Sequence, residues 1–222
     1  MHEPQAGALA AVAALDEPTR RRLYDYVVRQ PGPVSRDDVA AALSVPRPTV
    51  AFHLDRLVDA QLLAVGHERR TGRTGPGAGR PAKLYRRSDR QVTVSLPERD
   101  YELAGHLLAT AVEEAGETGG SAREILALRA RELGEQRGAA AADLTAALEA
   151  HGFEPRAEEG EVALGNCPFH RLARAHPELV CEMNLALVAG LLTGVGAPEL
   201  TARPDPRPGR CCVRLTASWA PS

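Results

Sequence analysis

Two short amphipathic segments joined by a tight turn constrain the fold of the first ninety residues more than any other feature. Ser35 can cap a helix whose first turn carries Asp37 and Asp38, because acidic side chains favour the positive end of a helix. A tight turn at 44–45 follows, and a second segment over about 46–59 repeats apolar residues at helical spacing. The opposite face of that segment is polar and basic. This pattern predicts a helix-turn-helix, with an ordinary helical hairpin as the alternative.

A further helix is predicted ahead of this pair. Asp16 is a suitable N-cap and Pro18 suits the first turn, where its missing N–H has no cost. Leu23 and Val27 would mark the buried face, and the Pro-Gly-Pro sequence at 31–33 ends the helix. The N-terminal segment therefore predicts a compact helical domain.

A basic hairpin is predicted after the helices. Residues 61–65 and 82–85 have strand character, and the segment between them is rich in glycine. From His67 to Arg90 there are eight Lys or Arg residues against two acids. Such a hairpin after a helix-turn-helix is typical of a wing that contacts phosphates or the minor groove; a solvated charged loop is the alternative. Helices and wing together predict DNA binding.

The expected DNA contacts form two groups. The helix over about 46–59 can reach base edges or phosphates with Arg47, Thr49, His53 and Arg56. The wing can hold phosphates with Arg69, Arg70, Arg73, Arg80 and Lys83. His53 precedes a core leucine and could equally well pack or hydrogen-bond within the domain.

Three segments of this region carry a family resemblance. They are residues 15–20 (LDEPTR), 47–54 (RPTVAFHL) and 79–85 (GRPAKLY). They resemble winged helix-turn-helix regulators of the ArsR-like type. The resemblance implies a homodimer that binds a double-stranded operator with two-fold symmetry, and it does not identify what is sensed.

The net charge of −2 hides a marked asymmetry. Residues 1–90 hold 15 Lys and Arg against 10 acids, whereas residues 91–222 hold 12 against 19. The basic part suits a polyanion and the acidic part does not. No basic region precedes the N-terminal alanine-rich stretch, and the apolar run over about 185–197 is shorter than a membrane span. We therefore expect a cytoplasmic protein without a membrane partner.

The remaining chain divides into central helices and a cysteine-bearing region. Helices are predicted from 95–98 to about 115, from Ser121 onward, and from about 139 to Gly152. The expected domains are a winged helix-turn-helix over 10–92, a helical dimerisation region over 96–152 and an α+β sensor domain over 153–222. The expected fold class is mainly α with α+β.

All four cysteines lie in the last 56 residues. Cys167 is predicted at a strand-to-helix turn and Cys181 one turn into an apolar helix, while Cys211 and Cys212 are predicted at the start of the last strand. Adjacent strand residues point to opposite faces, which predicts three convergent thiols that include Cys211.

Thiolates favour iron–sulfur clusters or zinc. The gaps of thirteen and twenty-nine residues are longer than those of compact zinc knuckles and fit a cluster held between a helix and a strand. Unrelated buried cysteines would show the same spacing. An enzyme with Cys167 and His170 as nucleophile and base lacks an acidic partner and an oxyanion motif, so neither an enzyme nor a small organic substrate is expected.

A second resemblance covers the cysteine-bearing region. Residues 166–170 (NCPFH), 180–185 (VCEMNL) and 210–213 (RCCV) resemble the C-terminal domain of SufR-type regulators. Those are ArsR-like iron–sulfur proteins that repress cluster-assembly operons. The resemblance implies that Cys167, Cys181 and Cys211 hold a cluster. Candidates for the fourth ligand are Cys212, His170, Glu178 and Glu182.

The sequence as a whole predicts a dimeric DNA-binding repressor that senses iron or redox status through an iron–sulfur cluster. A zinc-sensing or thiol-redox-sensing regulator is the alternative from the same class. A constitutive DNA-binding protein with a structural C-terminal domain is a further alternative.

Overall fold

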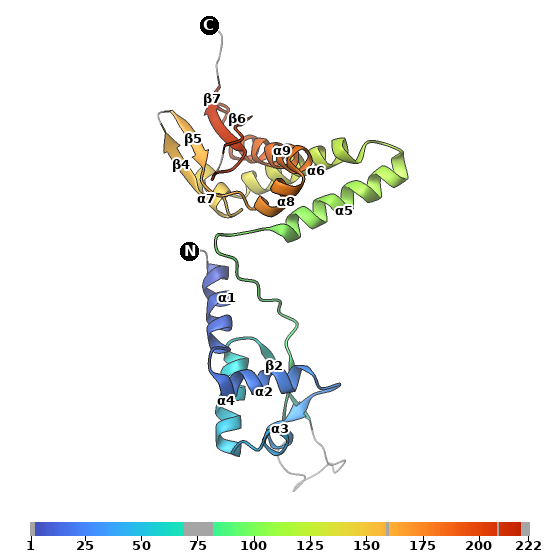
Figure 1. Ribbon diagram of the computed structural model, residues 1–222, viewed down its shortest axis with the longest axis vertical. Coiled ribbons are helices and arrows are strands. Elements are labelled where there is room, and N and C mark those ends of the chain that lie inside the picture. Colours follow the sequence, from blue (N-terminus) through green and yellow to red (C-terminus); the bar gives the residue numbers. More distant parts are fainter. Residues whose placement is uncertain (1–2, 69–81, 159, 208, 219–222) are drawn as a thin grey trace. The chain divides into compact units, whose positions relative to one another are not determined.

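The computed structural model describes residues 3–68, 82–158, 160–207 and 209–218, and the chain divides into two compact units, residues 1–94 and 95–222 (Figure 1). The helices of the first unit are α1 (Glu3–Ala14), α2 (Pro18–Val28), α3 (Arg36–Leu43) and α4 (Arg47–Asp59). Its strands are β1 (Val34–Ser35), β2 (Leu63–Glu68) and β3 (Ala82–Arg87). They form an antiparallel sheet in the order β1-β3-β2. This layout confirms the predicted winged helix-turn-helix.

Local sequence explains where these helices begin and end. Ser35 caps α3 as predicted by accepting a hydrogen bond from the backbone N–H of Asp38, and Asp38 accepts one from Ser35, so the cap is a full capping box. Ser44 ends α3 in the left-handed conformation. The predicted N-cap of α2 is wrong. Glu17 rather than Asp16 fills that role, because its longer side chain reaches two backbone N–H groups of the first turn.

The core of the first unit is built from the predicted apolar stripes. Leu23, Val27, Val50 and Leu54 are almost completely buried. Tyr85 on β3 joins them and lies opposite Val34 and Val65 in the sheet. The strand therefore fastens the wing to the helices, which fixes the exposed face of α4.

The second unit combines helices with a four-stranded sheet. Its helices are α5 (Tyr101–Thr118), α6 (Ala122–Ala139), α7 (Leu144–Glu149), α8 (His170–Ala175) and α9 (Pro177–Val195). Its strands are β4 (Pro155–Glu158), β5 (Glu161–Leu164), β6 (Leu200–Pro204) and β7 (Val213–Ala217), antiparallel in the order β4-β5-β7-β6. Residues from α5, α6 and α7 share one hydrophobic core with residues of the cysteine-bearing region.

Two predicted helices in this unit have other bounds than expected. The helix expected from 95–98 begins at Tyr101, where Asp100 caps it by accepting from the N–H of Leu103. The helix expected from about 139 to Gly152 is instead the end of α6 followed by the short α7. Gly152 does adopt a positive φ of 73° beyond that helix.

Helices α6 and α9 pack with their backbones in direct contact. A Cβ at Gly134 or Gly138 of α6 would collide with a carbonyl oxygen of α9, and a Cβ at Gly190 or Gly194 of α9 would collide with one of α6. Only glycine permits this approach. The contact fixes α9, the helix that carries Cys181.

Helix α9 is the described helix whose length and composition would allow it to cross a membrane. Its residues Leu187, Val188 and Leu191 are nevertheless completely buried in the core of the second unit. The apolar character of α9 is thus accounted for by packing, as the sequence predicted.

Candidate functional site

Helix α4 presents a basic face to solvent. Arg47 and Arg56 are exposed, and Phe52 between them is 56% exposed, which is unusual for so large an apolar side chain. The guanidinium of Arg56 stacks 5.5 Å from the centroid of the Phe52 ring. Arg47 pairs with Asp37 of α3, while Thr49 is half-buried. An exposed recognition helix with two arginines suits contact with a DNA groove.

His53 is less accessible than the other candidates. Its side chain is 12% exposed, and its Nδ1 lies 3.5 Å from Oε2 of Glu17. The Phe52 ring packs edge-on against the imidazole. The structure therefore places His53 between α4 and the start of α2. This position agrees with the packing role that the sequence left open as an alternative to DNA contact.

The wing is fastened to α4 by ionic and polar contacts. Lys83 of β3 pairs with Asp55 of α4, and Tyr85 donates a hydrogen bond to the same carboxylate at 3.2 Å. The Asp55 carboxylate raises the pKa of Lys83. Lys83 thus connects wing and recognition helix, a role that spacing alone did not indicate. Four further candidates lie outside the described residues, namely Arg69, Arg70, Arg73 and Arg80.

The four cysteines converge from three separate segments of the second unit. Cys167 lies in the turn before α8, Cys181 in the first turns of α9, and Cys211 and Cys212 directly before β7. Cys167, Cys181 and Cys212 line one cavity, and Nδ2 of Asn184 lies 3.1 Å from Sγ of Cys211 and 4.0 Å from Sγ of Cys212. The chain therefore forms one continuous thiol cluster, and all four cysteines are free.

The structure differs from the sequence-based expectation in where the two adjacent cysteines lie and in which of them faces the cavity: Cys212, and not Cys211, is among the lining residues. Strand β7 begins at Val213, so the two cysteines precede it and do not follow the alternation of a strand. Cys211 is 1% exposed, whereas Cys212 is half-buried and accessible. Both thiols are consequently part of the cluster.

Contacts within the cluster separate the thiols into two kinds. Hydrogen bonds with Cys211 lower the pKa of Cys167 and lower the pKa of Cys212 to about 6. The pKa of Cys211 is raised by its bonds to the same neighbours. Burial raises the pKa of Cys181 to about 12. Cys167 and Cys212 are thus the thiols most readily ionised, and the thiolate is the form that binds metals.

A cavity of about 550 Å³ lies beside this cluster. The thiol-bearing residues that line it are Cys167, Cys181 and Cys212, with Cys211 behind them. Its ionisable lining residues besides the thiols are His170, Arg174, Arg207 and Arg210. No carboxylate lines it among the described residues, so the cavity, called here the thiol pocket, suits an anionic group.

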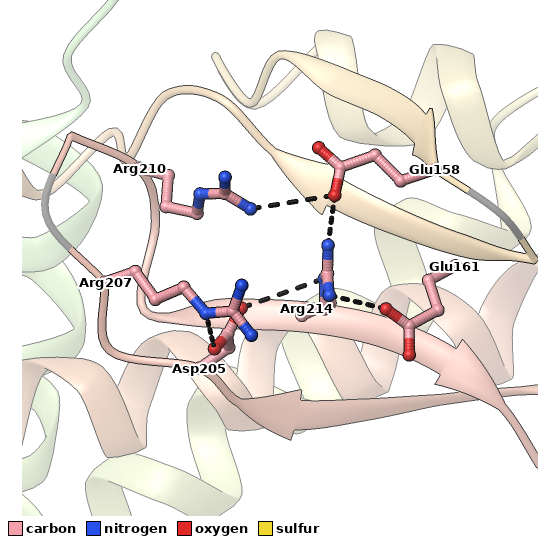
Figure 2. Close-up of polar contacts among 6 residues, drawn as sticks. All are labelled: Glu158, Glu161, Asp205, Arg207, Arg210 and Arg214. Atoms are coloured by element: carbon pink, nitrogen blue, oxygen red, sulfur yellow. Dashed lines mark hydrogen bonds and ion pairs between the residues drawn. The ribbon is translucent and has the colours of Figure 1, made fainter.

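The loop 205–212, which carries two of the cysteines, is held by a network of ion pairs (Figure 2). Arg214 of β7 is 15% exposed and pairs with Glu158, Glu161 and Asp205. Arg210 lies 3.7 Å from Glu158. The backbone N–H of Asp205 donates to the carbonyl of Cys212 at 2.7 Å, which closes the loop. Charged groups from three strands and the loop therefore fix the position of Cys211 and Cys212.

A second set of hydrogen bonds holds the Cys167 turn. Asn166 is buried and donates through Nδ2 to the carbonyls of Glu98 and Gly152, at 2.9 and 2.6 Å. Arg99 donates to the Cys167 carbonyl at 3.2 Å and to the Asn166 side chain. Asp100 donates its N–H to the carbonyl of Pro168 at 3.1 Å. These contacts form what we call the latch, which joins segment 98–100 to the Cys167 turn.

The donor set fits a soft metal or a cluster in its chemistry. Four thiols meet at one place, and sulfur ligands are those that iron–sulfur clusters and zinc prefer. Within the described part of the chain, no group of three or more His, Cys, Asp or Glu side chains is already arranged around a metal position. Glu178 and Glu182, named from sequence as fourth-ligand candidates, pair with Arg123 and do not line the thiol pocket.

Several residues of this site were not singled out from the sequence. Asn166 belongs to the segment that carries the family resemblance but was given no role of its own, and Arg99 carries no local signal. Asn184 is a polar residue in an apolar helix, which is a signal that could have been used. The arginines Arg174, Arg207 and Arg210 are brought to the thiol pocket only by the tertiary fold.

Comparison with known proteins identifies the N-terminal part. Residues 15–66 match a family model described as a helix-turn-helix domain. No curated protein sequence matches the chain closely enough to serve as a relative. The match covers α2 to β2 and supports a DNA-binding transcriptional regulator.

Proposed function

We propose that this DNA-binding regulator senses iron or redox status through an iron–sulfur cluster held by its cysteine-bearing unit. The observation that carries the proposal is the convergence of four thiols from three segments beside a basic cavity. A cavity of about 550 Å³ is larger than one metal ion requires, which favours a polyatomic group. Bound to thiolates, such a cluster is anionic, and Arg174 would offset its charge, with a smaller contribution from Arg207 and Arg210 because they already pair with Asp205 and Glu158.

The thiols that line the cavity are the expected ligands. Cys167, Cys181 and Cys212 would hold the cluster, and Cys211 or His170 would be the fourth ligand. This assignment gives Cys212 the place that sequence reasoning favoured for Cys211, because Cys212 is the accessible member of the pair. When bound, the group supplies a redox-sensitive and oxygen-sensitive centre; its loss would leave the thiols free to form the contacts described above.

The latch offers a route from the thiol pocket towards the DNA-binding unit. Segment 98–100 lies only a few residues after the end of the first unit at Val94. It is hydrogen-bonded to the Cys167 turn through Arg99, Asn166 and Asp100. A change in the Cys167 turn would therefore be transmitted to the chain that leads into the first unit. Coupling of about 1–3 kcal/mol would change DNA affinity roughly 5–150-fold, which is enough for a switch.

The resemblances noted in the sequence favour a homodimer in the cytoplasm that represses cluster-assembly genes from a two-fold operator. The exposed apolar residues Val112 on α5 and Leu128 on α6 are available for contacts between subunits. Neither dimerisation nor repression requires an enzymatic activity or a small organic substrate.

A zinc or thiol-redox sensor is the second candidate function, and one observation favours it. The free thiols of Cys211 and Cys212 both lie near Nδ2 of Asn184, at 3.1 and 4.0 Å, and neighbouring thiols of this kind also suit one zinc ion or oxidation to a disulfide. The metal content of the purified protein separates the two candidates.

The DNA-binding half is tested first by selection of binding sites from a random-sequence duplex library. The affinity of the selected duplex is then measured by fluorescence anisotropy for cluster-loaded and metal-free protein, over a range of salt concentrations. We expect the two forms to differ at least fivefold. Equal affinities would contradict the proposed switch while leaving DNA binding intact.

A recognition-helix variant provides the internal reference for that experiment. Arg56→Ala should weaken binding and reduce the salt slope by about one, because one phosphate or base contact is lost. Arg29→Ala, at the exposed end of α2, is the matched control and should leave the slope unchanged. An unchanged slope for Arg56→Ala would remove α4 from the DNA interface.

A further inference from the structure

The most anomalous polar side chain in the second unit is Asn184. It is completely buried on α9, between Met183 and the core residues Leu187 and Val188. A leucine at this position would continue the apolar face of the helix. A buried amide is retained against the cost of its desolvation only where it has a specific partner or a specific use.

The partner of the Asn184 amide is the thiol cluster. Nδ2 of Asn184 donates to Sγ of Cys211 at 3.1 Å and lies 4.0 Å from Sγ of Cys212. Asn184 follows Cys181 by three residues, so both side chains project from the same face of α9. Its Oδ1 is buried and has no hydrogen-bond partner among the described residues. The amide is therefore oriented so that its N–H groups face the cysteine sulfurs, while its oxygen is left without a hydrogen bond among the described residues.

We propose that Cys211 is the fourth ligand, that Asn184 is its positioning residue, and that N–H donation from Asn184 to the Cys211 sulfur raises the reduction potential of the bound cluster. The inference rests on the proposed function, because it concerns the cluster held by the same cysteines. A hydrogen bond to a thiolate withdraws electron density from the sulfur and stabilises the reduced, more negative state. Asn184 would also hold Cys211 and Cys212 together before the cluster is loaded.

The test compares four proteins after anaerobic reconstitution with iron and sulfide. They are the wild type, Asn184→Leu, Asn184→Asp and Met183→Leu. Asn184→Leu removes the donor and keeps an apolar volume, whereas Asn184→Asp keeps the shape and replaces the NH₂ group. Met183→Leu is the matched control, since it changes the adjacent buried side chain with little change of volume. Iron and sulfide content, reduction potential and far-ultraviolet circular dichroism are measured for each.

We expect both Asn184 variants to have a more negative reduction potential than the wild type, or to lose the cluster, while their helical content is unchanged. Met183→Leu should match the wild type in both respects. Folded Asn184 variants that hold the cluster at the wild-type potential would overturn the inference. If Asn184→Leu does not fold, Asn184→Asp alone decides by the same two results. A wild-type protein that takes up no iron and sulfide would instead overturn the proposed function, so the two failures are distinguishable.

Discussion

At the scale of single residues, the thiol pocket depends on which cysteines face the cavity rather than on their order in the chain. Cys211 and Cys212 are neighbours in sequence, yet Cys211 is buried and does not line the cavity, whereas Cys212 does. Cys181 is the thiol contributed by a long helix, which is fixed by its packing against α6. Because α9 is held in place, no other cysteine can easily take the position of Cys181.

Replacement of this thiol gives the first prediction. Cys181→Ser should lose most or all of the bound iron and sulfide, because a hydroxyl is a poor ligand for a soft cluster. Ala186→Ser, which adds a hydroxyl further along α9 outside the thiol pocket, should retain the wild-type content. Iron and sulfide analysis after anaerobic purification makes the comparison. Retention of the cluster by Cys181→Ser would sink the ligand assignment.

His151 gives a prediction for the pH dependence of stability. Burial and the nearby Arg137, whose Nη1 lies 3.0 Å from Nδ1 of His151, lower the pKa of His151 from 6.5 to about 4. The unfolded chain therefore binds the extra proton first as pH falls. The stabilising contribution of neutral His151 is complete above about pH 6.5 and is lost as pH falls towards 4.

Between pH 7.5 and pH 5 this loss should amount to roughly 1 kcal/mol of unfolding free energy, after allowance for the partial exposure of the ring. Urea unfolding at pH 7.5 and pH 5 measures it in the wild type and in His151→Gln, which does not titrate. The variant should lose less stability between the two pH values. The same loss in both proteins would show that His151 is not the titrating group.

At the scale of elements, the sequence was a good guide to helices with a clear stripe and a poor guide to how closely they pack. The predicted α3, α4 and α9 were found within one or two residues of their expected starts. The four glycines between α6 and α9 were missed, because glycine in a helix carries a local cost and its benefit comes only from a partner helix. No periodicity within one segment reports that benefit.

Gly190→Ala tests this contact. The added methyl group would collide with the carbonyl of Arg131 on α6, so we expect a loss of about 3 kcal/mol in unfolding free energy. Gly105→Ala on α5 is the matched control, because no atom lies within 4 Å of a Cβ placed there. That control should be neutral or stabilise by up to about 1 kcal/mol. Equal unfolding curves for the two variants would contradict the close packing of α6 and α9.

The late start of α5 has a cause outside its own sequence. Residues 95–98 resemble a helix start, but Glu98 and Arg99 form hydrogen bonds to the Cys167 turn instead. Asp100 then caps α5 and also donates its N–H to Pro168. The partners lie nearly 70 residues away, so local propensity could not reveal them. The hydrogen bonds that delay the start of α5 are therefore the same ones on which the proposed coupling depends.

Arg99→Ala should uncouple the two functions. Removal of its hydrogen bonds to Asn166 and the Cys167 carbonyl should leave cluster content unchanged, because no thiol is altered. The ratio of the DNA affinities of cluster-loaded and metal-free protein should fall towards one. Arg171→Ala, an exposed arginine of α8, serves as the control and should keep the wild-type difference. If Arg99→Ala keeps the wild-type ratio of DNA affinities, the latch does not couple the thiol pocket to DNA binding.

At the scale of the whole molecule, the sequence indicated the winged helix-turn-helix and the mixed α+β character, and both are found. The charge asymmetry and the basic face of α4 agree with a DNA-binding first unit. The convergence of the thiols could be expected only in outline. Sequence spacing named the cysteines, but the arginines around the cavity and the buried Asn184 depend on contacts between distant segments.

The most direct test of the account is the absorption spectrum of anaerobically purified protein, combined with iron, sulfide and zinc analysis. We expect a brown protein with broad absorbance at about 400 nm and matching amounts of iron and sulfide. A colourless protein with stoichiometric zinc, or one without metal even after reconstitution, would contradict the iron–sulfur sensor. In that case the DNA-binding unit would stand and the thiol pocket would need another ligand.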